Sequence, residues 1–297
     1  MASILNPLTT WNGITVALSD GHGMETAGKR TPYINALKRS IRENEFNAPV
    51  VDFLTELLRK NGFKVLHVSD GNTDVPLKTR TDAANKQKAD IYVSIHYNAS
   101  DSKFDGDAKD PSGLEIFVYN GNLNYNSGKL ANCVAKYLKQ GTVQKWRGIK
   151  EGNLHEVRET KMPAILTECG FMDNEREAML MLDVNFQKEC AEEHARGICD
   201  YFGKPFKVGF DKPVTVTKPV TTAPTKTDEL KGTEPMIKFI EQHQLNRLAG
   251  IYKDARTAGV ISSDQWEKKA ANGTITVGEV AFLATVIEHE RTAKAKK

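Results

Sequence analysis

The feature that most constrains the fold is a regular alternation of short apolar segments with longer amphipathic ones. Five runs of apolar and β-branched residues are typical of buried strands. They span residues 14–18, 64–68, 91–95, 114–119 and 164–168. Between and after them, apolar residues recur at helical spacing. These helical segments span residues 49–62, 76–88, 127–141 and 185–203. Strand–helix alternation favours an α/β fold: a mostly parallel, twisted sheet with helices on both faces.

A stretch rich in proline and threonine divides the chain. Residues 204–234 interleave prolines with Thr, Val and Lys and show no amphipathic period, so we expect a semi-extended linker. The linker follows a large domain at residues 1–203. After it, residues 235–297 show helical spacing again, and we expect a small all-helical C-terminal module there.

Composition excludes several function classes. A hydrophobic fraction of 39% and a charged fraction of 27% fit a soluble globular protein. The net charge of +3 is too small to indicate nucleic acid, and no run approaches the ~20 apolar residues of a membrane helix. Residues 1–13 lack the basic region and apolar core of a secretory signal, so we expect the protein to be made in the cytoplasm without a standard export signal. The cysteines lack CxxC spacing, which favours unpaired thiols. They are Cys133, Cys169, Cys190 and Cys199.

Two histidines come directly after predicted strands. His22 lies in a glycine-flanked loop after the first strand, and His96 ends the third. Functional groups gather beyond the carboxyl ends of parallel strands, so we expect both imidazoles at one edge of the sheet. A catalytic zinc ion needs three protein ligands and an open position for water, so a carboxylate would complete the set. A single histidine at a strand end is usually a hydrogen-bonded structural residue, and two histidines after parallel strands bring the metal-ligand role to equal standing.

Three glutamates are candidates for that carboxylate. Glu25 lies three residues after His22, as in the HxxE pair of zinc carboxypeptidases. In a helix, Glu43 would share a side with apolar residues and Glu45 would lie on a charged face, which favours Glu43. Pro49 predicts a kinked or frayed helix entrance at this point. Residues 40–43 also spell a capping box, which would give Glu43 a purely structural role.

Glu168 is the second notable carboxylate, because it ends an apolar strand and is followed by Cys169 and a glycine. Burial there is costly unless the group is paired or near a cation. The structural alternative is a salt bridge, for which Arg158 is the candidate. The functional alternative is a general base that takes a proton from a metal-activated water and passes it to a leaving nitrogen.

Six segments, in this order, resemble the zinc-dependent N-acetylmuramoyl-L-alanine amidases of the Amidase_3 type. The resemblance covers about residues 13–203. The segments are GHG at 21–23, ENEFN at 43–47, VPLKTRTDAAN at 75–85, ADIYVSIHYNAS at 89–100, SGLEIFVY at 112–119 and LHEVRETKMPAILTECGFMDNEREAMLM at 154–181.

The resemblance implies a set of roles. Zn²⁺ would be held by His22, Glu43 and His96, and Glu168 would be the catalytic acid/base. Asn98 or a nearby backbone N–H would steady the tetrahedral oxygen. The implied reaction is hydrolysis of the amide between the lactyl group of N-acetylmuramic acid and L-alanine in bacterial peptidoglycan. The chain departs from the family at the position three before the first histidine, where the usual aspartate is a serine, Ser19.

The overall organisation resembles a bacteriophage endolysin. Such enzymes wait in the host cytoplasm until the membrane is breached, then degrade the cell wall. The resemblance implies that residues 235–297 bind the wall, with self-association as the alternative, and it implies neither nucleic-acid nor membrane partners. Two rival functions remain. One is a zinc carboxypeptidase that uses His22, Glu25 and His96, and the other is a wall-binding protein without catalytic activity.

Overall fold

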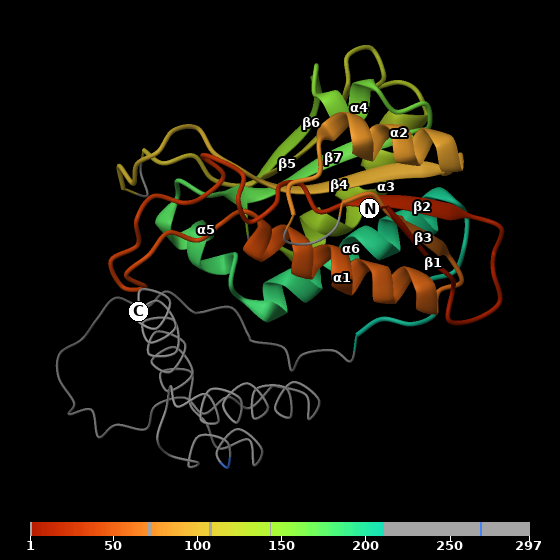
Figure 1. The fold of residues 1–297 in the computed structure, drawn as a ribbon, viewed down its shortest axis with the longest axis horizontal. Coiled ribbons are helices and arrows are strands. Elements are labelled where there is room, and N and C mark those ends of the chain that lie inside the picture. Colours follow the sequence, from red (N-terminus) through yellow and green to blue (C-terminus); the bar gives the residue numbers. More distant parts are fainter. Residues whose placement is uncertain (1, 70–72, 107–108, 143, 211–267, 269–297) are drawn as a thin grey trace, which may run out of the picture. The chain divides into compact units, whose positions relative to one another are not determined.

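A seven-stranded sheet forms the centre of the described chain, in the order β1-β3-β2-β4-β7-β5-β6 (Figure 1). The structure, a computed structural model, describes residues 2–69, 73–106, 109–142 and 144–210, together with Lys268. The strands are β1 (Ser3–Leu5), β2 (Thr15–Ser19), β3 (Lys64–His67), β4 (Ile91–Asn98), β5 (Leu114–Tyr119), β6 (Trp146–Gly152) and β7 (Ala164–Phe171). The rest of the expected linker, 211–234, and the expected module, 235–297, lie outside the described residues apart from Lys268.

The sheet is mostly parallel, as expected. Strands β3, β2, β4 and β7 run parallel to one another, and β5 runs parallel to β6. The exceptions are β1, which is antiparallel to β3, and the β5–β7 pair. β1 and β6 were not predicted from the sequence. β6 reads WRGIKEG, which has no apolar run, and it forms because the edge of β5 supplies hydrogen-bonding partners.

Helices cover both faces of the sheet, which confirms the predicted α/β class. Alternate residues of each strand point to opposite faces. Ile91, Val93 and Ile95 of β4 join the larger apolar cluster with three long helices, α1, α3 and α6, whereas Tyr92 joins a smaller cluster under α2 and α4 (Figure 1). The helices are α1 (Asn44–Lys60), α2 (Leu77–Gln87), α3 (Asn126–Gly141), α4 (His155–Arg158), α5 (Glu175–Leu180) and α6 (Val184–Tyr201).

Helix α1 begins at Asn44 and carries Pro49 inside it, so the expectation of a helix entered near Pro49 was wrong. Proline has no N–H and leaves the carbonyl four residues earlier without its helical partner. Here that carbonyl belongs to Glu45, and the side-chain amide of Gln187 on α6 donates to it at 3.3 Å. The contact with α6 compensates for the proline, and Glu43 becomes the N-cap residue of α1.

The residues that follow α6 fold back onto the domain. Asn61 accepts from the N–H of Lys207 at 2.7 Å and donates to the carbonyl of Val208 at 2.8 Å. The N–H of Phe210 donates to Glu192 at 2.9 Å. Residues 204–210, which the sequence assigned to the linker, therefore contact the α/β domain. In the ranges that the structure describes, no helix combines the length and the apolar character needed to cross a bilayer.

Candidate metal centre

Three side chains that lie far apart in the sequence meet beyond the carboxyl ends of β2 and β4. His22 comes from the loop after β2, His96 from β4, and Glu43 from the start of α1. One ligand atom from each lies within 4.8 Å of the others. His22 Nε2 is 3.8 Å from Glu43 Oε2, and His96 Nδ1 is 3.1 Å from Glu43 Oε1. The two imidazole rings are 5.1 Å apart between centroids.

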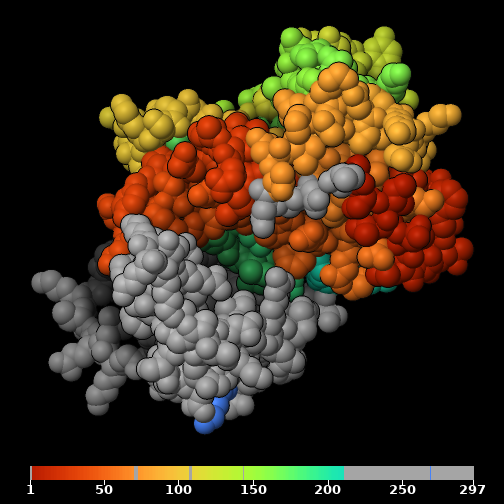
Figure 2. Space-filling view, viewed as in Figure 1, coloured from red at the N-terminus to blue at the C-terminus, as the bar shows by residue number. Residues whose placement is uncertain are grey.

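The loop between β2 and α1 places His22 through short-range contacts. Gly21 has φ +65°, a region that suits glycine, and a Cβ there would lie 3.0 Å from His96 Cε1. Asn44 donates its amide to the carbonyl of His22 at 2.6 Å. The N–H of Glu43 donates to the carbonyl of Lys29 at 3.0 Å, which fixes the far end of the loop. In Figure 2 the dark-orange surface of this loop adjoins the lighter orange surface of α2.

Glu43 is buried, and its two oxygens differ. Oε1 accepts from the N–H of Tyr97 and from the amide of Asn47, each at 3.1 Å. Oε2 is buried without any hydrogen-bond partner. Burial raises the pKa of Glu43, but the hydrogen bond and charge of His96 outweigh it and lower the pKa to about 2. An ionised, buried oxygen without a partner is costly, and a bound cation would satisfy it. Two imidazoles and a carboxylate are a donor set that zinc accepts.

The other candidate carboxylates lie elsewhere. Glu45 accepts hydrogen bonds from Nη1 and Nη2 of Arg39, at 2.7 and 2.8 Å, and from the backbone N–H of Arg42 at 2.8 Å. Glu25 has a side chain that is 86% exposed and lies 3.5 Å from Arg42. The capping box at residues 40–43 would need Ser40 as the N-cap, but α1 begins at Asn44 with Glu43 as its N-cap, and Glu43 makes no side-chain capping bond. Of the three glutamates, the fold brings Glu43 to the histidines.

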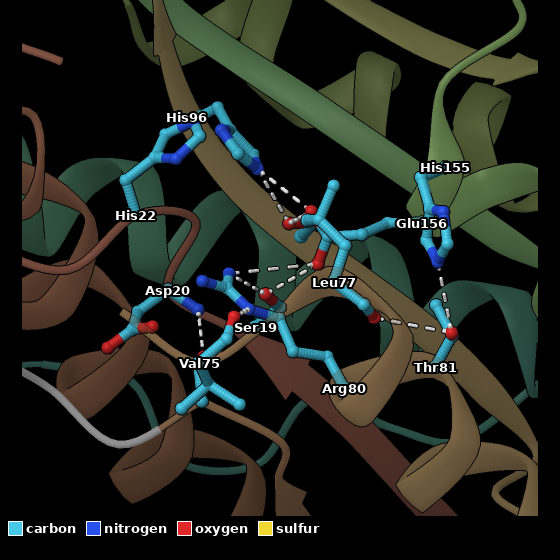
Figure 3. Close-up of polar contacts among 12 residues, drawn as sticks. Ser19, Asp20, His22, Val75, Leu77, Arg80, Thr81, His96, His155 and Glu156 are labelled. Atoms are coloured by element: carbon cyan, nitrogen blue, oxygen red, sulfur yellow. Dashed lines mark hydrogen bonds and ion pairs between the residues drawn. The ribbon is translucent and has the colours of Figure 1, made fainter. Parts of the chain in front are cut away.

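His96 has a second carboxylate neighbour that the sequence analysis missed. Its Nε2 lies 3.2 Å from Oε2 of Glu156, which comes from α4 on the α2 side of the sheet (Figure 3). Burial lowers the pKa of His96, but the hydrogen bonds to Glu156 and Glu43 outweigh it and raise the pKa to about 10. For His22, burial dominates and lowers the pKa to about 4. The sequence offered one indication of such a residue. Position 19 has a serine where the family resemblance leads one to expect an aspartate, so a carboxylate from another segment could take its place.

Glu168 lies beside this group. It is the Cα partner of His96 across the β4–β7 pair, so both side chains project from the same face of the sheet. Its Oε2 is buried without a hydrogen-bond partner, and burial raises its pKa to about 8. The alternative salt bridge is not formed, since Arg158 binds Glu159 at 2.7 Å and Asn153 at 2.8 Å instead.

Asn98, the expected contact of the tetrahedral oxygen, is occupied by another interaction. Its side-chain amide donates to Oε1 of Glu115 at 2.9 Å. The other oxygen of Glu115 accepts from Arg147 at 2.7 Å and from Lys150 at 2.5 Å. This cluster holds Asn98 in place and leaves its amide directed at Glu115.

Comparison with known proteins gives one consistent result. The profile of the Amidase_3 family, described as N-acetylmuramoyl-L-alanine amidase, matches residues 16–200. An uncharacterized cell wall amidase of Bacillus anthracis is 32% identical over an alignment of 200 residues, and the match covers 64% of this chain and 36% of that protein. The endolysin of Bacillus phage SPP1 is 29% identical over an alignment of 210 residues, and the match covers 69% of this chain and 72% of the endolysin.

Solved structures agree with the profile. The catalytic domain of CwlV, an N-acetylmuramoyl-L-alanine amidase from Paenibacillus polymyxa, superimposes with a TM-score of 0.56 and 30% identity, and the match covers 65% of this chain and 99% of that domain. An N-acetylmuramoyl-L-alanine amidase from Clostridium difficile gives a TM-score of 0.57 at 30% identity, covering 65% of this chain and 98% of that one. Both the sequence profile and the fold therefore assign this chain to the Amidase_3 family of N-acetylmuramoyl-L-alanine amidases.

Proposed function

We propose that the chain is a zinc-dependent N-acetylmuramoyl-L-alanine amidase that cleaves the lactyl–L-alanine amide of bacterial peptidoglycan. The observation that carries the proposal is the convergence of His22, Glu43 and His96 within 4.8 Å, with one buried oxygen of Glu43 left without a partner. Family membership supports peptidoglycan as the substrate class. The donor set supports zinc, which is commonly held by two imidazoles and a carboxylate in hydrolases.

His22, Glu43 and His96 would hold the ion, and Glu168 would transfer protons. When bound, zinc polarises the scissile carbonyl and lowers the pKa of a water molecule to ~7. Tyr97 N–H and the Asn47 amide hold the carboxylate of Glu43 through Oε1, which leaves Oε2 facing His22 at 3.8 Å. Glu43 is thus fixed before any ion binds, and this preorganisation reduces the cost of binding.

Glu168 is the proposed acid/base. A group with a pKa of about 8 is able both to accept and to release a proton near neutral pH. Its carboxylate would remove a proton from the attacking water, then deliver that proton to the nitrogen of L-alanine as the amide bond breaks. The uncharged amine then leaves, and the carboxylate returns to its starting state.

The test uses purified peptidoglycan and the full chain. We expect new alanine amino groups on the stem peptides, loss of this activity with a chelator, and recovery when zinc is added. Glu168→Gln should lower the rate of release about 10²–10⁴-fold while it leaves zinc binding intact. Release of free C-terminal amino acids instead would indicate the carboxypeptidase. Binding to walls without any release, by a protein that contains no zinc, would indicate the wall-binding alternative.

The biological role that we propose is lysis of a bacterial host, as for the SPP1 endolysin, which the chain resembles over 72% of that protein's length. We also propose that residues 235–297 bind the cell wall. The test compares the full chain with a chain that ends at residue 210, because residues 204–210 contact the domain. Equal sedimentation of both with intact walls would contradict a wall-binding role and leave self-association, which their masses in solution would reveal.

A further inference from the structure

The structure assigns to Glu156 a positioning role at the metal centre: its carboxylate holds the Nε2–H of His96, so that Nδ1 is presented to the metal. This inference rests on the proposed zinc function. It concerns a residue from the four-residue helix α4 that lies against Nε2 of His96, whereas Glu43 lies against Nδ1. Figure 3 shows His96 on one side of Glu156 and Arg80 on the other.

The carboxylate of Glu156 is fully buried and fully occupied. Oε1 accepts from the hydroxyl of Ser19 at 2.7 Å and from that of Tyr92 at 2.6 Å. Oε2 lies 3.2 Å from the hydroxyl of Ser94 and 3.2 Å from Nε2 of His96. Donors on all sides favour the ionised form of a carboxylate. A charged group so placed accepts hydrogen bonds and donates none.

The directions of these hydrogen bonds fix the proton on His96. An ionised Glu156 only accepts, so Nε2 must carry the hydrogen that faces it. The hydroxyl of Ser94 donates to Glu156, so its oxygen, 2.9 Å from Nε2, accepts from the same N–H. The remaining nitrogen, Nδ1, faces Glu43 at 3.1 Å, inside the group of three candidate ligands. The nitrogen that binds a metal is set by the hydrogen bond that the other nitrogen makes.

Arg80 compensates for only part of the charge. Its Nη1 is 4.0 Å from Glu156 Oε1 and 3.1 Å from the hydroxyl of Ser19, and its Nη2 is 3.2 Å from Asp74. Ser19 therefore accepts from Arg80 and donates to Glu156. Arg80 is shared between two carboxylates, which leaves His96 as the direct cationic or N–H partner of Glu156. An apolar side chain would fill the space under α4 at a lower free-energy cost than a buried carboxylate, so space-filling alone does not explain Glu156.

Ser19 explains why the carboxylate comes from α4. Serine stands here where the family resemblance leads one to expect an aspartate on β2, and Ser19 is the Cα partner of Ser94 on β4. The Ser19 hydroxyl faces α4 and donates to the carboxylate of Glu156 at 2.7 Å, so a carboxylate from α4 lies beside position 19. The two positions are therefore expected to be coupled: a carboxylate at 19 should be unfavourable beside Glu156 and useful without it.

The experiment measures zinc affinity of the full chain by competition with a chromophoric chelator. Glu156→Gln keeps the shape of the side chain but offers one acceptor oxygen in place of two. We expect zinc affinity to fall about 10- to 100-fold, the usual effect of losing such a partner. The matched control is Glu177→Gln, another buried carboxylate, which accepts from the N–H groups of Gly113 and Phe171. The control should bind zinc as the wild type does.

Equal zinc affinity of Glu156→Gln and the wild type would overturn the inference while the proposed function stands. A wild type that binds no zinc would overturn both. If Glu156→Gln does not fold, long-range ¹H–¹⁵N spectra of the zinc-loaded wild type decide: we expect the His96 proton on Nε2, and a proton on Nδ1 overturns the inference. Ser19→Asp is then introduced into two backgrounds. It should raise the zinc affinity of the Glu156→Gln variant and lower the zinc affinity of the wild type. An equal effect in both backgrounds would overturn the coupling.

Discussion

Gly21 offers the sharpest test of how the backbone builds this site. Gly21→Ala adds one methyl group at φ +65°, between α1 and β4 at the candidate metal centre. The new Cβ would lie 2.5 Å from the amide nitrogen of Asn47, 2.8 Å from the carbonyl of Ile95 and 3.0 Å from His96 Cε1. Ordinary contact begins at 3.4 Å, so these atoms must recede by roughly half an ångström or more. Asn47 holds Glu43, and His96 is itself a proposed ligand.

Gly28 provides the matched control in the same loop. It has φ +76°, and a Cβ there meets nothing within 4 Å. The left-handed backbone costs an L-residue about 1–2 kcal/mol, and both variants should lose this much unfolding free energy. Gly21→Ala should lose more stability, because it also carries the steric overlap. It should also lose activity on the order of 10²-fold, since a shift of about 1 Å at a catalytic geometry has that effect.

The assay pairs urea unfolding with the rate of amine release from peptidoglycan and with zinc affinity. The expected pattern is a stability loss in both variants, with loss of zinc affinity and rate confined to Gly21→Ala. If the two variants behave alike in rate and zinc affinity, the close approach of Gly21 to His96 does not matter for the site. The reasoning from backbone geometry to chemistry would then be wrong.

The remaining predictions concern titratable groups. Glu168→Gln should lower the rate about 10²–10⁴-fold with unchanged zinc affinity, because only proton transfer is lost; a parallel loss of zinc would contradict its role. Burial raises the pKa of Glu193 to about 10, so from pH 4.5 upward the unfolded chain loses a proton that the folded chain keeps. Between pH 4.5 and about 10, Glu193→Gln should therefore gain stability over the wild type by about 1.4 kcal/mol per pH unit, and a gain that does not change with pH would refute this. His194 is buried and neutral: Nδ1 donates to the carbonyl of Cys190 at 2.6 Å, the hydroxyl of Thr167 donates to Nε2 at 3.0 Å, and burial lowers its pKa to about 4. The stability that it contributes is complete above pH 6.5 and is lost as the pH falls toward 4. Urea unfolding across this range should show a smaller acid loss for His194→Gln than for the wild type.

Local pattern was sufficient for most of the architecture. The apolar strands and amphipathic helices follow from side-chain periodicity, which is a property of neighbouring residues. The same periodicity predicted an inward-facing Glu43, which is buried as the N-cap of α1, and a strand that delivers His96, although β4 continues two residues further, to Asn98. The family resemblance, which rests on short segments such as GHG and ENEFN, predicted His22, Glu43 and His96 as ligands, and the fold brings these three residues together.

Elements without a strong period of their own were missed. β6 and β1 are strands because a neighbouring edge pairs with them, and α4 is too short to show a helical pattern. The start of α1 at Asn44 was also not predicted. Pro49 fits inside the helix because Gln187, from the other end of the domain, donates to the carbonyl of Glu45 that the proline leaves without a helical partner. Tertiary contact overrode the local rule in each of these cases.

The amino-acid sequence by itself determined the α/β class, the family and the residues that could bind a metal, because strand and helix periodicity and short motifs are encoded locally. Only the tertiary structure decided which carboxylates face His96, where Asn98 directs its amide, and that Arg158 leaves Glu168 without a salt bridge. The two carboxylates that face His96 lie 53 and 60 positions away from it in the sequence, and Glu115, to which Asn98 donates, lies 17 positions from Asn98. Their geometry depends on how the layers pack, and a single sequence does not contain that information in any local window.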